Sequence, residues 1–214
     1  GVRIYSWAST QHSADPRQER PGKAVTDHYL NVAKTSMLFR ANLDALDRWA
    51  STGELPPPSR VPRVADGTLV PMEQWQQQFP AIPGATVPQE PNQLPLMDFG
   101  PDEAKGVLAQ EPPAVLAERG YTVLVPAVDA DGNEVAGVRC PMVQAPLGTY
   151  AGWNIRARGF GEGATHEFSG SYIPFPEDAA VRAATGDPRL SILERYGSAE
   201  GYIAAIERAC RELV

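Results

Sequence analysis

The sequence has few cysteines, few lysines and no long hydrophobic run. Its two cysteines, Cys140 and Cys210, lack the spacing of a metal site or of a disulfide-rich framework. We expect both to be buried structural thiols. No apolar run approaches the roughly eighteen residues that a membrane span requires, so we expect no membrane partner.

Basic residues are also fewer than acidic ones, 19 against 26, which gives a formal net charge of −7. No basic cluster offsets this balance. Nucleic-acid phosphates would be repelled by such a protein, so we expect no nucleic-acid partner.

Several motifs that carry chemistry are missing from the sequence. There is no Gly-x-Ser-x-Gly element around which a serine nucleophile could be built. The three histidines, His12, His28 and His166, are far apart and have no metal-ligand spacing. No glycine-rich loop leads into a Gly-Lys-Ser/Thr sequence. We therefore expect no metal and no cofactor.

The chain begins with Gly1, within a β-prone pattern, and shows no signal-peptide pattern. We expect a processed or shortened piece of a longer protein, or one chain of a split protein. The cellular location is not predicted.

The most informative segment is the first dozen residues, where the strand-like run Val2 to Trp7 leads through small residues to His12. In open parallel sheets, reacting groups gather just beyond the carboxyl ends of strands. A histidine there suits proton transfer near neutral pH. The alternative is a surface histidine after an edge strand.

Helical periodicity predicts a helix from about Thr35 to Ser51, with an apolar face that packs on a sheet and Gly53 just beyond its end. A short helix is expected before Gly186, a capping box at Ser191–Glu194, and a final helix from Ser198. The final helix should bury Tyr202, Ile203, Ile206, Cys210 and Leu213 on one face.

Between these helices the chain is rich in proline and in turn signals. A small hairpin is expected around Ala65–Thr68, and a stronger one in which 121–128 and 134–138 flank the Asp129–Asn133 turn. Residues 76–120 read as a wrapped coil with short elements.

The loop at 146–154 is punctuated by Gly148 and Gly152 and carries Tyr150, Trp153 and Asn154. Aromatic rings and an amide could line a substrate pocket near His12, the rings burying an apolar group and the amide holding a polar one. The same residues could instead pack the loop onto the core.

Segments along nearly the whole chain resemble the C-terminal half of a bacterial family known as alpha/beta-hydrolase domain proteins. The matching stretches are Val2–Tyr5, Thr10–His12, Leu43–Trp49, Pro57–Pro71, Phe79–Gly84, Val125–Arg139, Pro146–Tyr150, Gly152–Asn154, Gly170–Phe175 and Glu194–Gly197. In that family the Thr-Gln-His segment usually follows Gly, where this chain has Ser9.

The resemblance implies an α/β fold: residues 1–53 would be the last core strand and helix of an α/β-hydrolase sheet. Residues 54–214 would form a proline-rich cap or C-terminal region, with β-hairpins and C-terminal helices, packed on that core. It implies an esterase-like serine hydrolase with His12 as general base, acting on a small-molecule ester. The serine and its acidic partner would lie on an upstream segment or chain.

A second hypothesis is that the region from about Glu54 onward is a non-catalytic cap or binding module that associates with another chain. The absence of a nucleophile favours this hypothesis, and the length of the resemblance favours the hydrolase.

Overall fold

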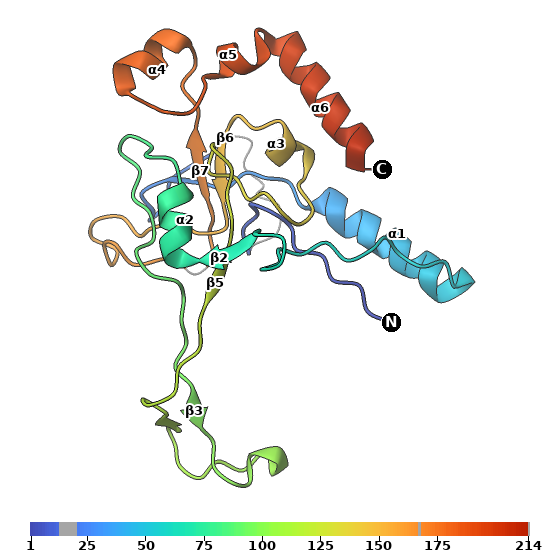
Figure 1. The fold of residues 1–214 in the computed structure, drawn as a ribbon, viewed down its shortest axis with the longest axis vertical. Helices are drawn as coiled ribbons and strands as arrows, with labels where there is room; N and C mark the ends of the chain where they lie inside the picture. The colour runs from blue at the N-terminus through green and yellow to red at the C-terminus, as the bar shows by residue number, and fades with distance from the viewer. Residues whose placement is uncertain (13–20, 167, 214) are drawn as a thin grey trace.

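The computed structural model describes residues 1–12, 21–166 and 168–213, which form a mixed α/β structure with small antiparallel sheets and six α-helices (Figure 1). The strands are β1 (Tyr29–Leu30), β2 (Leu69–Pro71), β3 (Met97–Asp98), β4 (Ala114–Val115), β5 (Leu124–Pro126), β6 (Gly148–Ala151) and β7 (Ser171–Pro174). The helices are α1 (Ser36–Thr52), α2 (Met72–Gln78), α3 (Pro141–Gln144), α4 (Ala179–Thr185), α5 (Ile192–Tyr196) and α6 (Ala199–Leu213), with a 3₁₀ turn at Glu103–Lys105.

The central sheet has the strand order β1-β7-β6 and is antiparallel throughout. Strand β7 pairs Tyr172 with Tyr29 on one side and with Tyr150 on the other. Strand β6, which the sequence analysis assigned to a loop, is a fully buried strand. Gly148 makes this possible, because a Cβ there would lie 2.5 Å from the Ile173 carbonyl oxygen.

The strongest predicted hairpin forms only at its tip. Val128 bridges Glu134 across the Asp129–Asn133 turn. Beyond the tip the two arms diverge, because β5 pairs with β2 while Val138 forms a parallel bridge with Trp7. The turn at 64–67 also forms, but the strand that follows it, β2, takes β5 as its partner.

The N-terminal residues, predicted as a core strand, are extended and make parallel bridges without forming a full strand. Tyr5 bridges Arg60 and Trp7 bridges Val138, both in parallel orientation. The backbone groups of Ile4, Ser6 and Ala8 make these hydrogen bonds. The backbone groups of successive residues in an extended chain point in alternate directions. The backbone groups of Tyr5 and Trp7 therefore face the opposite edge, where no described strand lies.

Helix α1 confirms the predicted helix, and Gly53 ends it with φ 78°. Its expected packing on a sheet is limited to its first turn, where Leu38 is buried in a cluster with Tyr150 of β6. Figure 1 shows α1 projecting from the body of the molecule. Phe39, Leu43 and Leu46 are 52, 63 and 55% exposed.

The C-terminal helices follow the sequence prediction in position and differ in which side chains they bury. Ser191 and Glu194 form the predicted capping box at α5. Helix α6 buries Ala205 and Ala209, whereas Ile203 and Cys210 are exposed, so the prediction of a buried Cys210 was wrong. Small residues permit close packing on α3, and that contact sets the rotation of α6. Cys140, by contrast, is buried as predicted.

Residues 93–121 form an arm that extends from the body and carries the β3–β4 pair (Figure 1). The expectation of a wrapped coil was therefore wrong for this part. Most of the arm is exposed, including Leu94, Val107 and Val115.

Two clusters of buried hydrophobic residues hold the body together. One joins Ala33 and Leu38 to Cys140, Val143 and Tyr150, and the other joins Val70, Met72, Trp75 and Ala127. None of the helices formed by the described residues is both long enough and apolar enough to cross a membrane.

Candidate functional site

His12 lies at the exposed end of the N-terminal segment, immediately after a turn at Ala8–Ser9. Its ring is 5.2 Å from the ring of Phe168, centroid to centroid, at an angle of 45°. Residues 13–20, which follow it, lie outside the described part of the chain. The imidazole is therefore accessible on the surface, at the end of a segment that is firmly attached on one edge.

The turn before His12 depends on Ser9, which is fully buried and has the left-handed φ of 56°. Residues other than glycine rarely adopt this conformation. A glycine would adopt it without this strain. Ser9 is held there by Glu134, whose Oε2 accepts the Ser9 N–H at 2.9 Å and whose N–H donates to Ser9 Oγ at 2.8 Å.

The segment that leads to His12 also touches the residues that follow β6, which include Trp153. A Cβ on Gly152 would lie 2.9 Å from the Thr10 carbonyl oxygen, so glycine allows these two backbones to meet. Just before β7, the Gly170 N–H donates to Oε1 of Gln11 at 3.1 Å. Thr10 precedes His12 by two residues in the sequence. These contacts therefore join the residues around Trp153 to the segment that carries His12.

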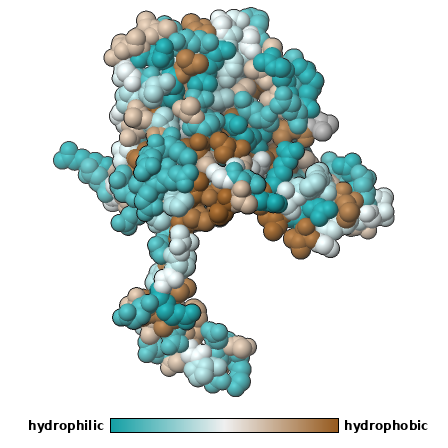
Figure 2. Space-filling view, in the orientation of Figure 1, coloured by the Kyte–Doolittle hydropathy of each residue, from teal (hydrophilic) through white to brown (hydrophobic). Residues whose placement is uncertain are grey.

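Beside this junction lies an apolar pocket with a cavity volume of about 180 Å³. Its walls come from α2, β5, the 128–134 turn and the end of β6. The lining residues are Met72, Trp75, Pro88, Glu90, Pro91, Asn92, Val125, Pro126, Val128, Gly132, Glu134, Tyr150, Ala151, Trp153 and Thr165. Figure 2 shows hydrophobic residues gathered near the centre of the molecule's face, in the region of β2 and β5, and again on α1.

Aromatic rings form one side of the pocket. Trp153 packs with its ring centroid 6.0 Å from that of Trp75 and 5.8 Å from that of Phe79. His28 lies behind Trp153, with its ring 6.1 Å away and its Nε2 2.6 Å from the Thr86 carbonyl oxygen. This wall suits an alkyl or acyl group.

The other two predicted pocket residues are held in the interior. Tyr150 touches the pocket but is 2% exposed, and burial raises the pKa of its hydroxyl. Asn154 does not line the pocket. Its Nδ2 donates to the carbonyl oxygens of His28 and Gly170, and its Oδ1 accepts the Ile155 N–H. The Asn154 amide thus joins β1, β7 and the end of β6.

The pocket contains a carboxyl group that the sequence analysis did not single out. Glu134 lies on its wall, and desolvation by burial raises the pKa of this carboxyl, opposed by the hydrogen bond from the Ser9 N–H. In the sequence, Glu134 looks like an ordinary charged residue after a Gly-Asn turn. Its burial results from a contact between residues 125 positions apart.

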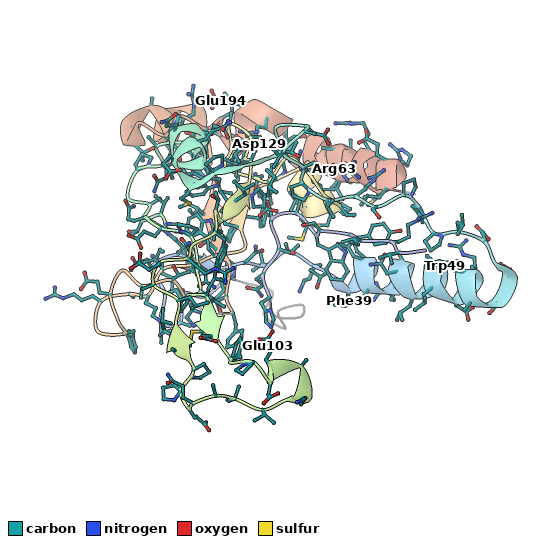
Figure 3. The ribbon with its side chains drawn as sticks, turned by 60° about the horizontal axis from the view of Figure 1, so that its bottom comes forward. Phe39, Trp49, Arg63, Glu103, Asp129 and Glu194 are labelled. Carbon is teal, nitrogen blue, oxygen red and sulfur yellow. The ribbon has the colours of Figure 1, made fainter. Side chains whose placement is uncertain are left out.

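A second, polar cleft separates the 129–139 turn from α5 and α6, and Figure 3 shows Asp129 and Glu194 in this region. Its charges largely pair within the protein. Arg139 binds Asp129 at 3.2 Å, and Arg195 forms an ion pair with Asp131. Among the described residues, no group of histidines, cysteines and carboxylates could hold a metal ion.

Comparison with known proteins identifies a family. The family model described as "Alpha/beta hydrolase domain" matches residues 1–214. No curated protein and no solved structure matches the chain. The family model spans the whole chain, and the match indicates a hydrolase-like function. The chain belongs to the alpha/beta hydrolase domain family.

Proposed function

We propose that the chain is the C-terminal part of an esterase-like serine hydrolase, in which His12 is the general base and Trp153 contributes to the substrate pocket. The observation that carries the proposal is the junction of the Ser9–His12 segment with Gly152, beside an apolar cavity. It supports the proposal because Thr10, two residues before the accessible imidazole, meets the chain next to Trp153, which lines a pocket that suits a short acyl group.

The chemistry requires a serine and an acid from an upstream segment or chain. His12 would take the proton of the serine hydroxyl as its oxygen bonds to the ester carbonyl carbon. The same proton would pass from the imidazole to the departing alkoxide. Water would then replace the alcohol and release the acid by the same two proton transfers.

The surface around residues 1–53 supports the presence of such a segment. No described strand lies along the edge at Tyr5 and Trp7, where the Thr10 hydroxyl donates to the Trp7 carbonyl oxygen, and a strand edge of this kind is a site for pairing. Next to it, Val2 and Ile4 are 72 and 58% exposed. Helix α1 adds the exposed side chains of Leu43 and Leu46. Phe39, labelled near the start of the helix in Figure 3, packs its ring on Trp7 with the centroids 4.3 Å apart and is still 52% exposed. A parallel sheet docked here would cover both the edge and the helix.

The test is the substitution His12→Ala in the complete protein that contains this chain, with hydrolysis of p-nitrophenyl esters as the measurement. We expect kcat to fall by about 10³-fold or more, with unchanged thermal unfolding, because triad histidines contribute several orders of magnitude. His166→Gln is the matched control. The His166 Nδ1 accepts backbone N–H groups of Phe168 and Ser169, and glutamine can provide an acceptor there.

Retention of more than about a tenth of kcat by His12→Ala would contradict the role of His12. The alternative, in which the region from about Glu54 onward is a non-catalytic cap or binding module, is favoured by the exposed hydrophobic residues Leu94, Val107 and Val115 of the 93–121 arm. It predicts that the native complex, analysed by mass spectrometry, holds a partner without any serine that labels with a fluorophosphonate.

A further inference from the structure

Glu134 is a carboxyl group placed among apolar and aromatic residues. Within the described part of the chain it forms no ion pair, and the cationic side chains nearest in sequence are bound elsewhere, as Arg139 is to Asp129. No lysine or arginine lines the pocket. Its one charged neighbour in the lining is Glu90, which is exposed and carries the same sign.

The two oxygens of Glu134 have different surroundings. Oε2 accepts the N–H of Ser9, which fixes the side chain, and the return bond from the Glu134 N–H to Ser9 Oγ fixes the backbone. Oε1 has no protein partner among the described residues, and it is not one of the fully enclosed atoms that lack a partner. Oε1 is therefore not fully enclosed, and because Glu134 lines the pocket, it is the oxygen left to bond a molecule there.

An ionised carboxylate in this position would have one N–H donor and no counter-ion, and burial of such a charge is costly. A carboxylic acid is the form that suits the site. It has a single O–H to donate, and with Oε2 occupied as an acceptor, that donor requires an acceptor in the pocket.

We propose that Glu134 binds, as a neutral hydrogen-bond donor, the oxygen of an uncharged carbonyl compound whose alkyl part lies against Trp75 and Trp153. The inference deepens the proposed function, since the pocket is the one that we assign to the ester. It narrows the ligand to an uncharged ester, amide or ketone with a short chain. A volume of about 180 Å³ has room for a group of roughly ten non-hydrogen atoms.

The strained conformation of Ser9 is consistent with this role. A non-glycine residue at φ 56° is retained where the surrounding structure requires it, often at a binding site. Here the hydroxyl of Ser9, which is three residues before His12 in the sequence, is needed to hold Glu134. The same turn thus orients the carboxyl of the pocket and leads to the proposed base.

The inference can be tested by binding alone, without hydrolysis. The probes are 2-heptanone, which is neutral, and hexyltrimethylammonium, which has a similar chain and a positive charge. The signals are the indole N–H resonances of Trp75 and Trp153 in the full chain. The variants are Glu134→Gln, which keeps an N–H donor without a charge, and Glu134→Met, which keeps the length and removes the donor.

We expect 2-heptanone to bind the parent chain more tightly than the ammonium probe. Glu134→Gln should retain its affinity for the ketone within about threefold, and Glu134→Met should lose about tenfold, the value of one net hydrogen bond. If Glu134→Met does not fold, the affinities of the two probes for Glu134→Gln still test the inference. The amide has no negative charge to attract a cation, so ammonium binding that depends on a carboxylate would be lost in this variant.

Any of three results would overturn the inference. These are tighter binding of the ammonium probe than of 2-heptanone, loss of ammonium binding in Glu134→Gln, and an unchanged ketone affinity in Glu134→Met. His12→Ala separates it from the proposed function. That variant should bind 2-heptanone normally, so a failed hydrolase assay with retained ketone binding leaves the pocket assignment standing.

Discussion

Ser9 and Glu134 hold each other by two hydrogen bonds, at 2.9 Å from the Ser9 N–H to Oε2 and at 2.8 Å from the Glu134 N–H to Ser9 Oγ. In this arrangement Ser9 has a left-handed backbone conformation, with φ 56°. The pair joins the turn that precedes His12 to the wall of the apolar pocket.

The first prediction compares the unfolding free energies of Ser9→Ala and Ser9→Gly. Alanine keeps the backbone strain and leaves the buried Glu134 N–H without an acceptor, so unfolding free energy should fall by about 1–3 kcal/mol. Glycine loses the same bond but relieves strain of about 1–2 kcal/mol, and it should unfold close to the parent. Urea unfolding measures both, and an alanine variant as stable as the glycine variant would contradict the account.

The second prediction concerns the pH dependence of Glu134. Burial raises the pKa of its carboxyl in the folded protein above the ordinary value of 4.5. Below that value the carboxyl is protonated in both states and imposes no cost. As the pH rises, the unfolded chain releases its proton first, so the stability of the fold falls until the folded carboxyl also ionises.

Glu134→Gln should therefore reduce the loss of stability that accompanies rising pH. It should unfold at a higher temperature than the parent at pH 7, with little difference at pH 4. Matched melting curves at the two pH values measure the effect. Glu194→Gln is the control of opposite sign. Hydrogen bonds from Ser191 lower the pKa of the Glu194 carboxyl to about 2, so its contribution is present above pH 4.5 and is lost as the pH falls toward 2. Equal pH slopes for Glu134→Gln and the parent would refute the prediction.

A third prediction concerns Arg189, which is 2% exposed and joins the C-terminal helices to the central sheet. Its guanidinium donates to Asp187 at 2.6 Å and to the carbonyl oxygens of Ile173 and Pro174. Lysine has fewer donors and cannot reproduce this geometry. Arg189→Lys should lower unfolding free energy by about 2–4 kcal/mol, whereas exposed Arg208→Lys on α6 should change it by less than about 0.5 kcal/mol.

Much of the local structure follows from the sequence, whereas long-range partners do not. The 36–52 helix is specified by its apolar period and by Gly53, and the α5 cap by Ser191 and Glu194, all of which are local signals. Strand β6 was missed because Gly148 and Gly152 are typical of loops, whereas Gly148 permits close approach to β7 and Gly152 permits close approach to Thr10.

The candidate site shows the same division. His12 could be proposed from its position after an extended segment. Glu134 could not, because its burial depends on Ser9, which is 125 residues away. The amide of Asn154 was expected in the pocket, but a buried amide that bonds several backbone groups has the same sequence signature as one that binds a ligand.

The exposed face of α1 gives a fourth prediction. Leu43→Glu and Leu46→Glu should leave the melting temperature of this chain nearly unchanged, because both side chains are more than half exposed. In the complete protein the same changes should weaken folding or assembly, since each fully buried leucine contributes about 1.5–3 kcal/mol. Asp44→Gln, on the exposed surface of the same helix, is the control. A chain that is monomeric, unaccompanied in its native state and indifferent to these changes would rule out docking at α1.

The last prediction separates two roles for Trp153, which packs against Trp75 and Phe79 and also lines the pocket. If the ring contacts the acyl chain of an ester, Trp153→Ala in the complete protein should lower kcat/KM for p-nitrophenyl hexanoate by about tenfold more than for the acetate. This difference corresponds to about 1.4 kcal/mol of lost apolar contact. If the ring only fills the core, the variant should melt at a lower temperature and lose the same factor on both esters. Trp153→Phe, which retains an aromatic ring, should restore most of the stability in either case, so the ratio between the two esters decides the question.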